Sequence, residues 1–196
     1  MSRVDRDTQL SDSVKIGSHV LIYPNVTILG PCVLGDHVTI APGVIIGADG
    51  MEYHRNEQGL LVETIHKSGV VIGDHVTIRA NTTIHRGATK PTVIGDGTKI
   101  GPNCNITHEV KIGKHGLITG ATTIAGETEL GDRVYIGPHT IVGSRLRIGN
   151  DVSIRIGSLV LHDISDGLTV AGSPAEPLEA FKRHREKLKR LLDETQ

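Results

Sequence analysis

The sequence predicts an all-β solenoid, namely a parallel β-helix of about seven coils with one protruding loop and a C-terminal α-helix. Three observations predict this fold class: an aliphatic residue recurs at every sixth position, Gly often follows it, and aromatic residues make up only 2% of the chain. A period of six fits neither an amphipathic helix nor an alternating strand, whereas short strands stacked coil on coil produce it. The core is therefore expected to consist of Ile, Val and Leu.

The hexapeptide repeat runs in three blocks, whose aliphatic positions span residues 16–46, 72–84 and 94–160 and amount to 21 hexads. With three hexads to a coil, these give seven coils of 18 residues, each covering the backbone of the next. The spacing alone does not fix the handedness of the coils.

Two insertions interrupt the frame. The step from Ile46 to Ile72 is 26 residues, and the step from Ile84 to Ile94 is ten. Both follow the third hexad of a coil, so both are expected to leave from one edge of the solenoid. The longer insertion, residues 47–71, is expected to be functional because long loops in regular folds usually are, and a passive subunit clamp is the alternative.

The hexads end after residue 160, and two prolines in the segment SDGLTVAGSPAEP precede a predicted helix. The expected division is a β-helix over residues 1–173 and a helix over residues 174–196. Apolar residues of the helix follow a 3-4-3-4 spacing, with Arg185 in the remaining seam position. They are Leu178, Phe181, Leu188 and Leu192. So short a stripe is expected to pack on a neighbour or on its own coil.

Charge and composition exclude several classes of function. The net charge is -1 and the pI is about 6.8, so no basic field exists to attract nucleic acid or an anionic membrane. The N-terminus lacks an apolar leader segment, and no apolar run reaches the ~20 residues that span a bilayer. A cytoplasmic protein is therefore expected. Cys32 and Cys104 lack metal-type spacing and are expected to be small buried residues.

The 11 histidines do not all have the same expected role. Five occupy the fourth place of a hexad and are expected to be solvated turn residues. These are His19, His37, His75, His115 and His139. His108 differs, because Glu109 follows it directly and it lies on the edge from which both insertions leave.

The hexad frame places His85 and Arg86 one coil below His108, and Gly126 one coil above it. An imidazole there is able to accept a proton from an attacking amine or hydroxyl, with Glu109 fixing its tautomer and the Gly126 N–H facing the oxyanion. The spacing does not distinguish this acyl-transfer site from one more solvated corner histidine.

The segments IGDHVTIRANTTIHRGATKPTVIGDG and GPNCNITHEVKIG resemble the left-handed β-helix N-acyltransferases, a family that includes UDP-3-O-acylglucosamine N-acyltransferase. GADGMEY resembles that family's insertion, and the likeness spans roughly residues 14–175. The His-Glu pair is also similar to that of N-acetyltransferases acting on nucleotide-linked 4-amino sugars. VAGSPAEPL resembles a segment of the coenzyme-A-dependent members.

This resemblance implies left-handed coils and a homotrimer with active sites between subunits. It implies His108 as general base, with Glu109 beside it and Gly126 at the oxyanion. The expected reaction transfers a short acyl group, such as acetyl, from acyl-CoA to the amine of an amino sugar, expected to be nucleotide-linked, without a metal. Residues expected to bind the acceptor are Tyr53, His54, Asn81, His85 and Arg86, and those expected to line the coenzyme A cleft are Ser144, Gly157 and Gly172.

Three departures from the family pattern bear on the acceptor. UDP-3-O-acylglucosamine N-acyltransferase has an N-terminal domain that binds uridine, whereas this chain begins almost directly with the coils. His85 replaces an acidic residue of the family's IDRG segment, and Met51 replaces an aromatic residue. The acceptor pocket is therefore expected to differ from that of UDP-3-O-acylglucosamine N-acyltransferase.

Three alternatives remain open from the sequence. One is a sugar O-acetyltransferase. Another is a metal hydrolase like the trimeric carbonic anhydrases, although no hexad supplies the two histidines five residues apart that such a zinc site requires. The last is a non-catalytic scaffold or binding module.

Overall fold

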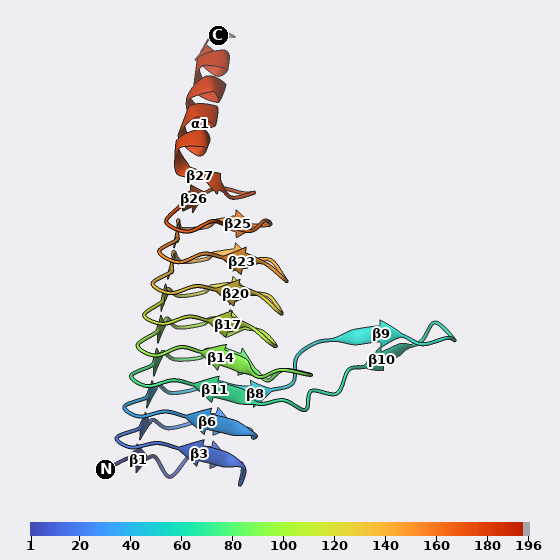
Figure 1. Ribbon diagram of the computed structural model, residues 1–196, viewed down its shortest axis with the longest axis vertical. Coiled ribbons are helices and arrows are strands. Elements are labelled where there is room, and N and C mark those ends of the chain that lie inside the picture. Colours follow the sequence, from blue (N-terminus) through green and yellow to red (C-terminus); the bar gives the residue numbers. More distant parts are fainter. Residues whose placement is uncertain (194–196) are drawn as a thin grey trace.

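The computed structural model describes residues 1–193 as a parallel β-helix whose coils stack along one axis and end in a single helix (Figure 1). Three sheets form the sides of the solenoid, and successive strands along the chain pass from one sheet to the next. Each coil therefore contributes one strand to each side. This all-β solenoid confirms the predicted fold class.

The strands of the three sheets are short, mostly of two or three residues. The seven-stranded sheet contains β3 (Val14–Ile16), β6 (Cys32–Leu34), β11 (Val70–Ile72), β14 (Thr92–Ile94), β17 (Lys111–Ile112), β20 (Glu129–Leu130) and β23 (Arg147–Ile148). The eight-stranded sheet contains β2 (Gln9–Leu10), β5 (Thr27–Ile28), β8 (Ile45–Ala48), β13 (Thr83–His85), β16 (Asn105–Ile106), β19 (Thr123–Ile124), β22 (Ile141–Val142) and β25 (Leu159–Val160).

The ten-stranded sheet extends furthest along the axis. It contains β1 (Arg3–Val4), β4 (Leu21–Ile22), β7 (Thr39–Ile40), β12 (Thr77–Ile78), β15 (Lys99–Ile100), β18 (Leu117–Ile118), β21 (Tyr135–Ile136), β24 (Ser153–Ile154), β26 (Thr169–Ala171) and β27 (Glu176–Pro177). All of its strands are parallel except β27, which pairs antiparallel with β26.

The solenoid has about nine turns rather than the predicted seven, because the coils continue past both ends of the recognised repeat. Val4 pairs with Ile22 although no glycine follows it, and it is 42% exposed because only one coil covers it. Beyond the last hexad, the step shortens to four residues, and Ile164 forms a bridge with Ile148. The terminal coils thus lack the features that define the repeat.

The core is a set of aliphatic ladders. Ile106, for example, is paired with Ile84 on one side and Ile124 on the other, and all three are fully buried. Cys32 and Cys104 are free thiols with 1% and 2% of their surface exposed, as predicted from their spacing. Burial raises the pKa of the Cys32 thiol to about 12.

Four of the five predicted turn histidines lie at the corner between the seven-stranded and ten-stranded sheets, and His139 lies at the next corner. The rings of His19, His37 and His75 stack at centroid distances of 4.7 Å, and all five predicted corner histidines are exposed. Each adopts a left-handed φ between 55° and 58°, which closes the turn between two sheets. These residues have the solvated turn role that their hexad position predicts.

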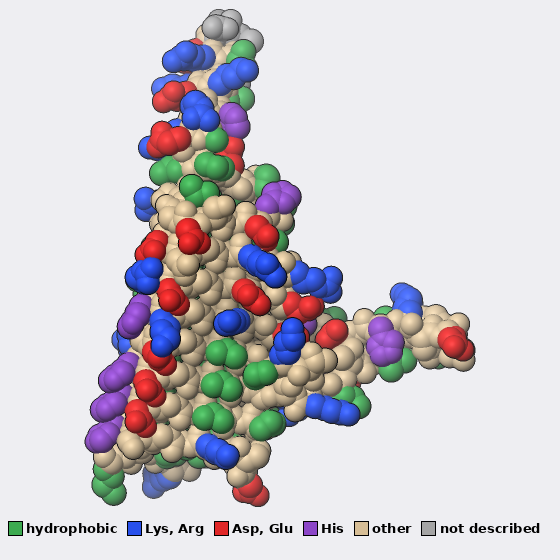
Figure 2. Space-filling view, viewed as in Figure 1, with side chains coloured by type: hydrophobic (Ala, Val, Ile, Leu, Met, Phe, Trp, Pro, Cys, Tyr) green, Lys and Arg blue, Asp and Glu red, His purple; other side chains and the backbone are tan. Residues whose placement is uncertain are grey.

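The longer insertion is an arm rather than an irregular loop. Strands β9 (Tyr53–Arg55) and β10 (Leu61–Glu63) pair antiparallel, and the hairpin extends away from the coils (Figures 1 and 2). Asn56 shapes its tip, because the side-chain oxygen accepts hydrogen bonds from the amides of Gln58 and Leu60. The arm leaves the coils after β8 and returns to them at β11.

The helix α1 (Leu178–Asp193) continues along the solenoid axis (Figure 1). Its first turn contacts the last coil, where Leu178 and Phe181 are half-buried. Further along, Leu188 is 49% exposed, so the predicted stripe packs on its own coil only at its start. The side chain of Leu192, also part of that stripe, lies outside the described residues. Within residues 1–193, no helix has the length and apolarity needed to cross a bilayer.

Candidate active site

The candidate site lies on the edge of the solenoid where the chain passes from the eight-stranded to the seven-stranded sheet, here called the insertion edge. Both insertions leave the coils there, after β8 and β13, as the hexad frame predicts. The two insertions also bind one another: the Ser68 amide donates to the Gly87 carbonyl at 2.9 Å, and the Lys67 amide donates to the Ala88 carbonyl at 3.4 Å. The return limb of the arm is thereby held against the coils beside His108.

His108 lies between two stretches of bare backbone. A Cβ on Gly126, one coil above, would be 2.6 Å from its Nε2 and Cε1, and a Cβ on Gly50 would be 3.0 Å from its Cδ2. Among the described residues, no acceptor receives a hydrogen bond from the Gly126 amide. The predicted neighbours His108 and Gly126 are therefore in contact, with a free N–H beside the imidazole.

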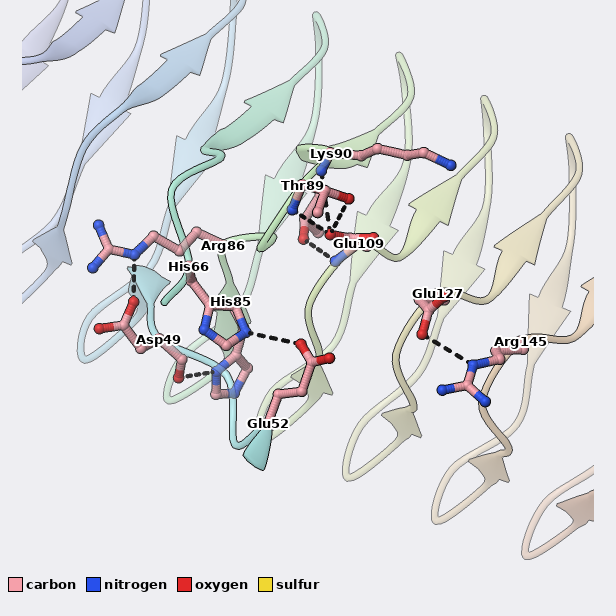
Figure 3. A network of polar contacts seen from close by, with 11 residues as sticks. Asp49, Glu52, His66, His85, Arg86, Thr89, Lys90, Glu109, Glu127 and Arg145 are labelled. Carbon is pink, nitrogen blue, oxygen red and sulfur yellow. Dashed lines mark hydrogen bonds and ion pairs between the residues drawn. The ribbon is translucent and has the colours of Figure 1, made fainter. Parts of the chain in front are cut away.

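Glu109 does not orient the His108 ring, so that expectation from the sequence is wrong. Its Oε1 accepts hydrogen bonds from the Thr89 amide at 2.6 Å, the Thr89 hydroxyl at 3.0 Å and the Lys90 amide at 3.2 Å (Figure 3). Burial alone would raise the pKa of this carboxyl, but these bonds and the nearby His108 lower the pKa below its usual value. Glu109 has a left-handed φ of 59°, and its side chain secures the second insertion instead.

His85 and Arg86 lie one coil below, but their polar groups are occupied. His85 bonds the Asp49 carbonyl through Nδ1 at 2.8 Å and Asn105 Oδ1 through Nε2 at 2.9 Å. Arg86 donates to Asp49 Oδ1 at 2.5 Å (Figure 3). It also donates to the Gly30 carbonyl at 3.1 Å. The hydrogen bond from Arg86 lowers the pKa of the Asp49 carboxyl. Arg86 thus anchors the base of the arm to the coils.

Two residues that the sequence reasoning missed complete the site. His66 is in the return limb of the arm, its side chain is fully buried, and its ring meets that of His108 edge to face at 5.5 Å. Glu52, at the foot of the arm, places Oε2 3.8 Å from His66 Nε2 (Figure 3). Neither residue belongs to a hexad, so the repeat contains no signal of where they lie.

The remaining predicted residues are dispersed in the single chain. Tyr53 and His54 lie in β9 of the extended arm, and Asn81 and Gly157 lie on the edge between the ten-stranded and eight-stranded sheets. Ser144 lies one coil above Gly126 on the insertion edge, and Gly172 lies against Phe181 of α1. In one chain, His108, Gly126 and Ser144 therefore lie on the same edge, whereas the other residues named in this paragraph lie elsewhere.

The cavity beside His108 has a volume of about 190 Å³ and is lined by Glu52, Thr89, Glu127 and their neighbours. Pockets that enclose drug-sized ligands usually measure about 300–1,000 Å³. The cavity formed by one chain is therefore smaller than this range.

Comparison with known proteins places the repeat in a family. A model of the bacterial transferase hexapeptide, six repeats, matches residues 13–48. The chain belongs to the hexapeptide-repeat family. This result, together with the fold, confirms the resemblance to left-handed β-helix acyltransferases at the level of family and architecture.

Several hexapeptide-repeat relatives carry names that describe an activity. UDP-3-O-acylglucosamine N-acyltransferase of Methylorubrum extorquens is 38% identical over 167 residues, which cover 85% of this chain and 47% of that protein. The probable UDP-3-O-acylglucosamine N-acyltransferase 2, mitochondrial, of Arabidopsis thaliana is 37% identical over 152 residues, covering 78% and 50%. The chain spans about half the length of the curated relatives that it matches.

Solved structures of the same architecture superpose on nearly all of the chain. UDP-N-acetylglucosamine acyltransferase from Campylobacter jejuni superposes with a TM-score of 0.76 at 27% identity, covering 97% of this chain and 79% of that one. The enzyme of the same name from Francisella novicida superposes with a TM-score of 0.77 at 25% identity, covering 93% and 71%.

Proposed function

We propose that this protein is an N-acyltransferase that moves an acyl group from a thioester donor to the amine of a nucleotide-linked amino sugar, with His108 as the general base. The observation that carries the proposal is the contact between the His108 imidazole and the backbone of Gly126, whose amide has no acceptor among residues 1–193. A proton acceptor beside a free N–H is the pair of groups that acyl transfer needs. The names of the hexapeptide-repeat relatives support the choice of acceptor.

The reaction is a direct transfer. The sugar amine attacks the thioester carbonyl, His108 accepts a proton from the nitrogen, and the Gly126 N–H stabilises the oxyanion. When the tetrahedral intermediate collapses, the carbon–sulfur bond breaks and the imidazolium returns the proton to the departing thiolate. The amide and a free thiol are the products, and the imidazole is regenerated.

The proposed assembly is a homotrimer. The small cavity beside His108 supports it, because a second chain has to supply further walls before a nucleotide sugar is enclosed. The hairpin of β9 and β10 extends away from the coils (Figure 1), and Asn81 lies on another edge of the solenoid, so these are the surfaces available to reach the site of a neighbour. The proposed donor is a short acyl-CoA, and a thioester of acyl carrier protein shares the same pantetheine chemistry.

The test measures thiol release from acetyl-CoA, longer acyl-CoA thioesters and acyl carrier protein thioesters, each with UDP-3-O-acylglucosamine. UDP-N-acetylglucosamine, whose amine is already acylated, reports acyl transfer to a hydroxyl. His108→Ala should lower the rate by about 10²–10⁴-fold, the usual contribution of a general base. His115→Asn is the matched control, because it removes an exposed histidine at another corner and Asn accepts its φ of 55°.

Each outcome has a defined meaning. A His108→Ala rate equal to that of wild type refutes the base assignment. Transfer to UDP-N-acetylglucosamine in place of the free amine assigns the enzyme to O-acylation. A complete lack of thiol release with every donor and acceptor supports the scaffold alternative.

A further inference from the structure

Beside the proposed base, three potential metal ligands converge from separate parts of the chain. Glu52 comes from the foot of the arm, His66 from its return limb and His108 from the coil after β16. One ligand atom of each lies within 4.8 Å of the other two, and within residues 1–193 this is the one cluster of three such side chains. The shortest separation given for the cluster is 3.8 Å, between His66 Nε2 and Glu52 Oε2.

Three of the four imidazole nitrogens in this cluster are buried without a hydrogen-bond partner among residues 1–193. Neither Nδ1 nor Nε2 of His66 makes a hydrogen bond, and His108 Nδ1 also makes none. Buried side-chain nitrogens are nearly always hydrogen-bonded, and each exception needs an explanation. A ligand that accepts electron pairs from nitrogen would supply the missing partner.

We propose that Glu52, His66 and His108 form a binding site for a divalent transition metal ion of the zinc class. Two imidazoles and one carboxylate are a ligand set that zinc accepts, with a fourth position left open for water or a ligand. Mg²⁺ prefers oxygen ligands and an octahedral shell, so this set selects against it.

The geometry requires only a modest contraction. Ligand atoms at about 2.0–2.2 Å from a tetrahedral zinc ion lie about 3.4 Å from one another. The pair at 3.8 Å has to close by a few tenths of an ångström, and the widest pair, at no more than 4.8 Å, by more. The Glu52 side chain is 43% exposed and is therefore free to move, whereas His66 is held in the core of the site.

Occupation of this site should inhibit the enzyme, a consequence that rests on the proposed function, whereas metal binding itself does not. A neutral imidazole has a single lone pair, which serves either a proton or a metal ion. A metal on either nitrogen of His108 therefore removes the electron pair that the amine proton requires. Zinc should act as a reversible inhibitor, and a chelator should restore the rate.

Metal binding is measured first, without any substrate. The full chain is stripped with a chelator and titrated with Zn²⁺ by calorimetry and with Co²⁺ by visible absorption, with Mg²⁺ as the negative control. One tight site per chain is expected. Glu52→Gln and His66→Leu should each weaken binding by about tenfold or more, because even the loss of an outer-shell partner costs about 10–100-fold.

The control variant addresses the exposed histidine column. His37→Asn removes the central ring of the His19–His37–His75 stack, an alternative surface site for Zn²⁺ or Co²⁺, and should leave the tight site unchanged. Glu52→Gln alters a partly exposed side chain, so its result stands even where His66→Leu fails to fold. Absence of a tight site in wild type, or its loss in His37→Asn and persistence in Glu52→Gln, would overturn the proposal.

The activity measurement separates this inference from the proposed function. The ratio of rates with and without Zn²⁺ is compared between wild type and Glu52→Gln, and the variant should require about tenfold more Zn²⁺ for the same inhibition. Tight binding without inhibition, or stimulation by Zn²⁺, would refute the blocked-base consequence and leave the site in place. If His108→Ala keeps full activity, the base assignment of the proposed function fails while the calorimetric result still decides the site.

Discussion

Replacing Gly126 with Ala should displace the His108 ring without removing any polar group from the proposed site. The new Cβ would lie 2.6 Å from His108 Nε2 and Cε1, whereas ordinary van der Waals contact begins at 3.4 Å. The ring therefore has to move by about 0.8 Å, the difference between the two distances. Misplacement of a catalytic group by about 1 Å costs on the order of 10²-fold in rate.

The assay is the rate of thiol release at saturating donor, accompanied by the thermal unfolding midpoint. We expect Gly126→Ala to lower the rate by about 10²-fold with little change in the midpoint, because the ring, rather than the coil backbone, gives way. Gly116→Ala is the matched control: Gly116 is also buried in the solenoid, but its Cβ would meet its nearest neighbour at 3.5 Å. A Gly126→Ala rate within twofold of the control, about 0.4 kcal/mol, would refute the reasoning that the ring position against Gly126 matters.

Two further predictions concern stability and reactivity. The pKa of the Glu109 carboxyl is lowered in the folded chain, so the stability it contributes is present above the unfolded-state pKa and is lost as the pH falls through the folded one. When the pH is lowered from about 7 to about 3, the thermal unfolding midpoint should therefore fall further in wild type than in Glu109→Gln. Equal decreases in the midpoint would contradict the role of Glu109 in holding the second insertion. Burial of Cys32 and Cys104 should prevent both thiols from reacting with a disulfide reagent at about pH 8 until denaturant is added, and rapid labelling of the folded chain would show that the coils open.

The hexad frame was sufficient to predict the contacts that recur from one coil to the next. A residue and its neighbour one coil away are separated by 18 positions, so the pairing of Ile106 with Ile124 and the contact of His108 with Gly126 follow from counting. The same counting placed both insertions on one edge. It failed at the solenoid ends, where Val4 has no following glycine and the step before Ile164 shortens.

The period could not predict side-chain directions at the corners. Glu109 follows His108 in the chain, yet its carboxylate binds Thr89 and Lys90, because the second insertion brings three donors to it. Arg86 is in the predicted coil, yet its guanidinium binds Asp49 at the foot of the arm. In both cases the charged group binds a donor or acceptor that belongs to an insertion. An insertion does not follow the hexad period, so counting along the sequence cannot place its residues.

The sequence by itself therefore determined the solenoid, its three sides and the meeting of His108 with Gly126, because the 18-residue coil converts spacing directly into contact. Only the tertiary structure brought Glu52 and His66 to His108 and turned Glu109 away from it. The path of the arm depends on hydrogen bonds with the second insertion and on packing against the coils, interactions between segments outside the repeat.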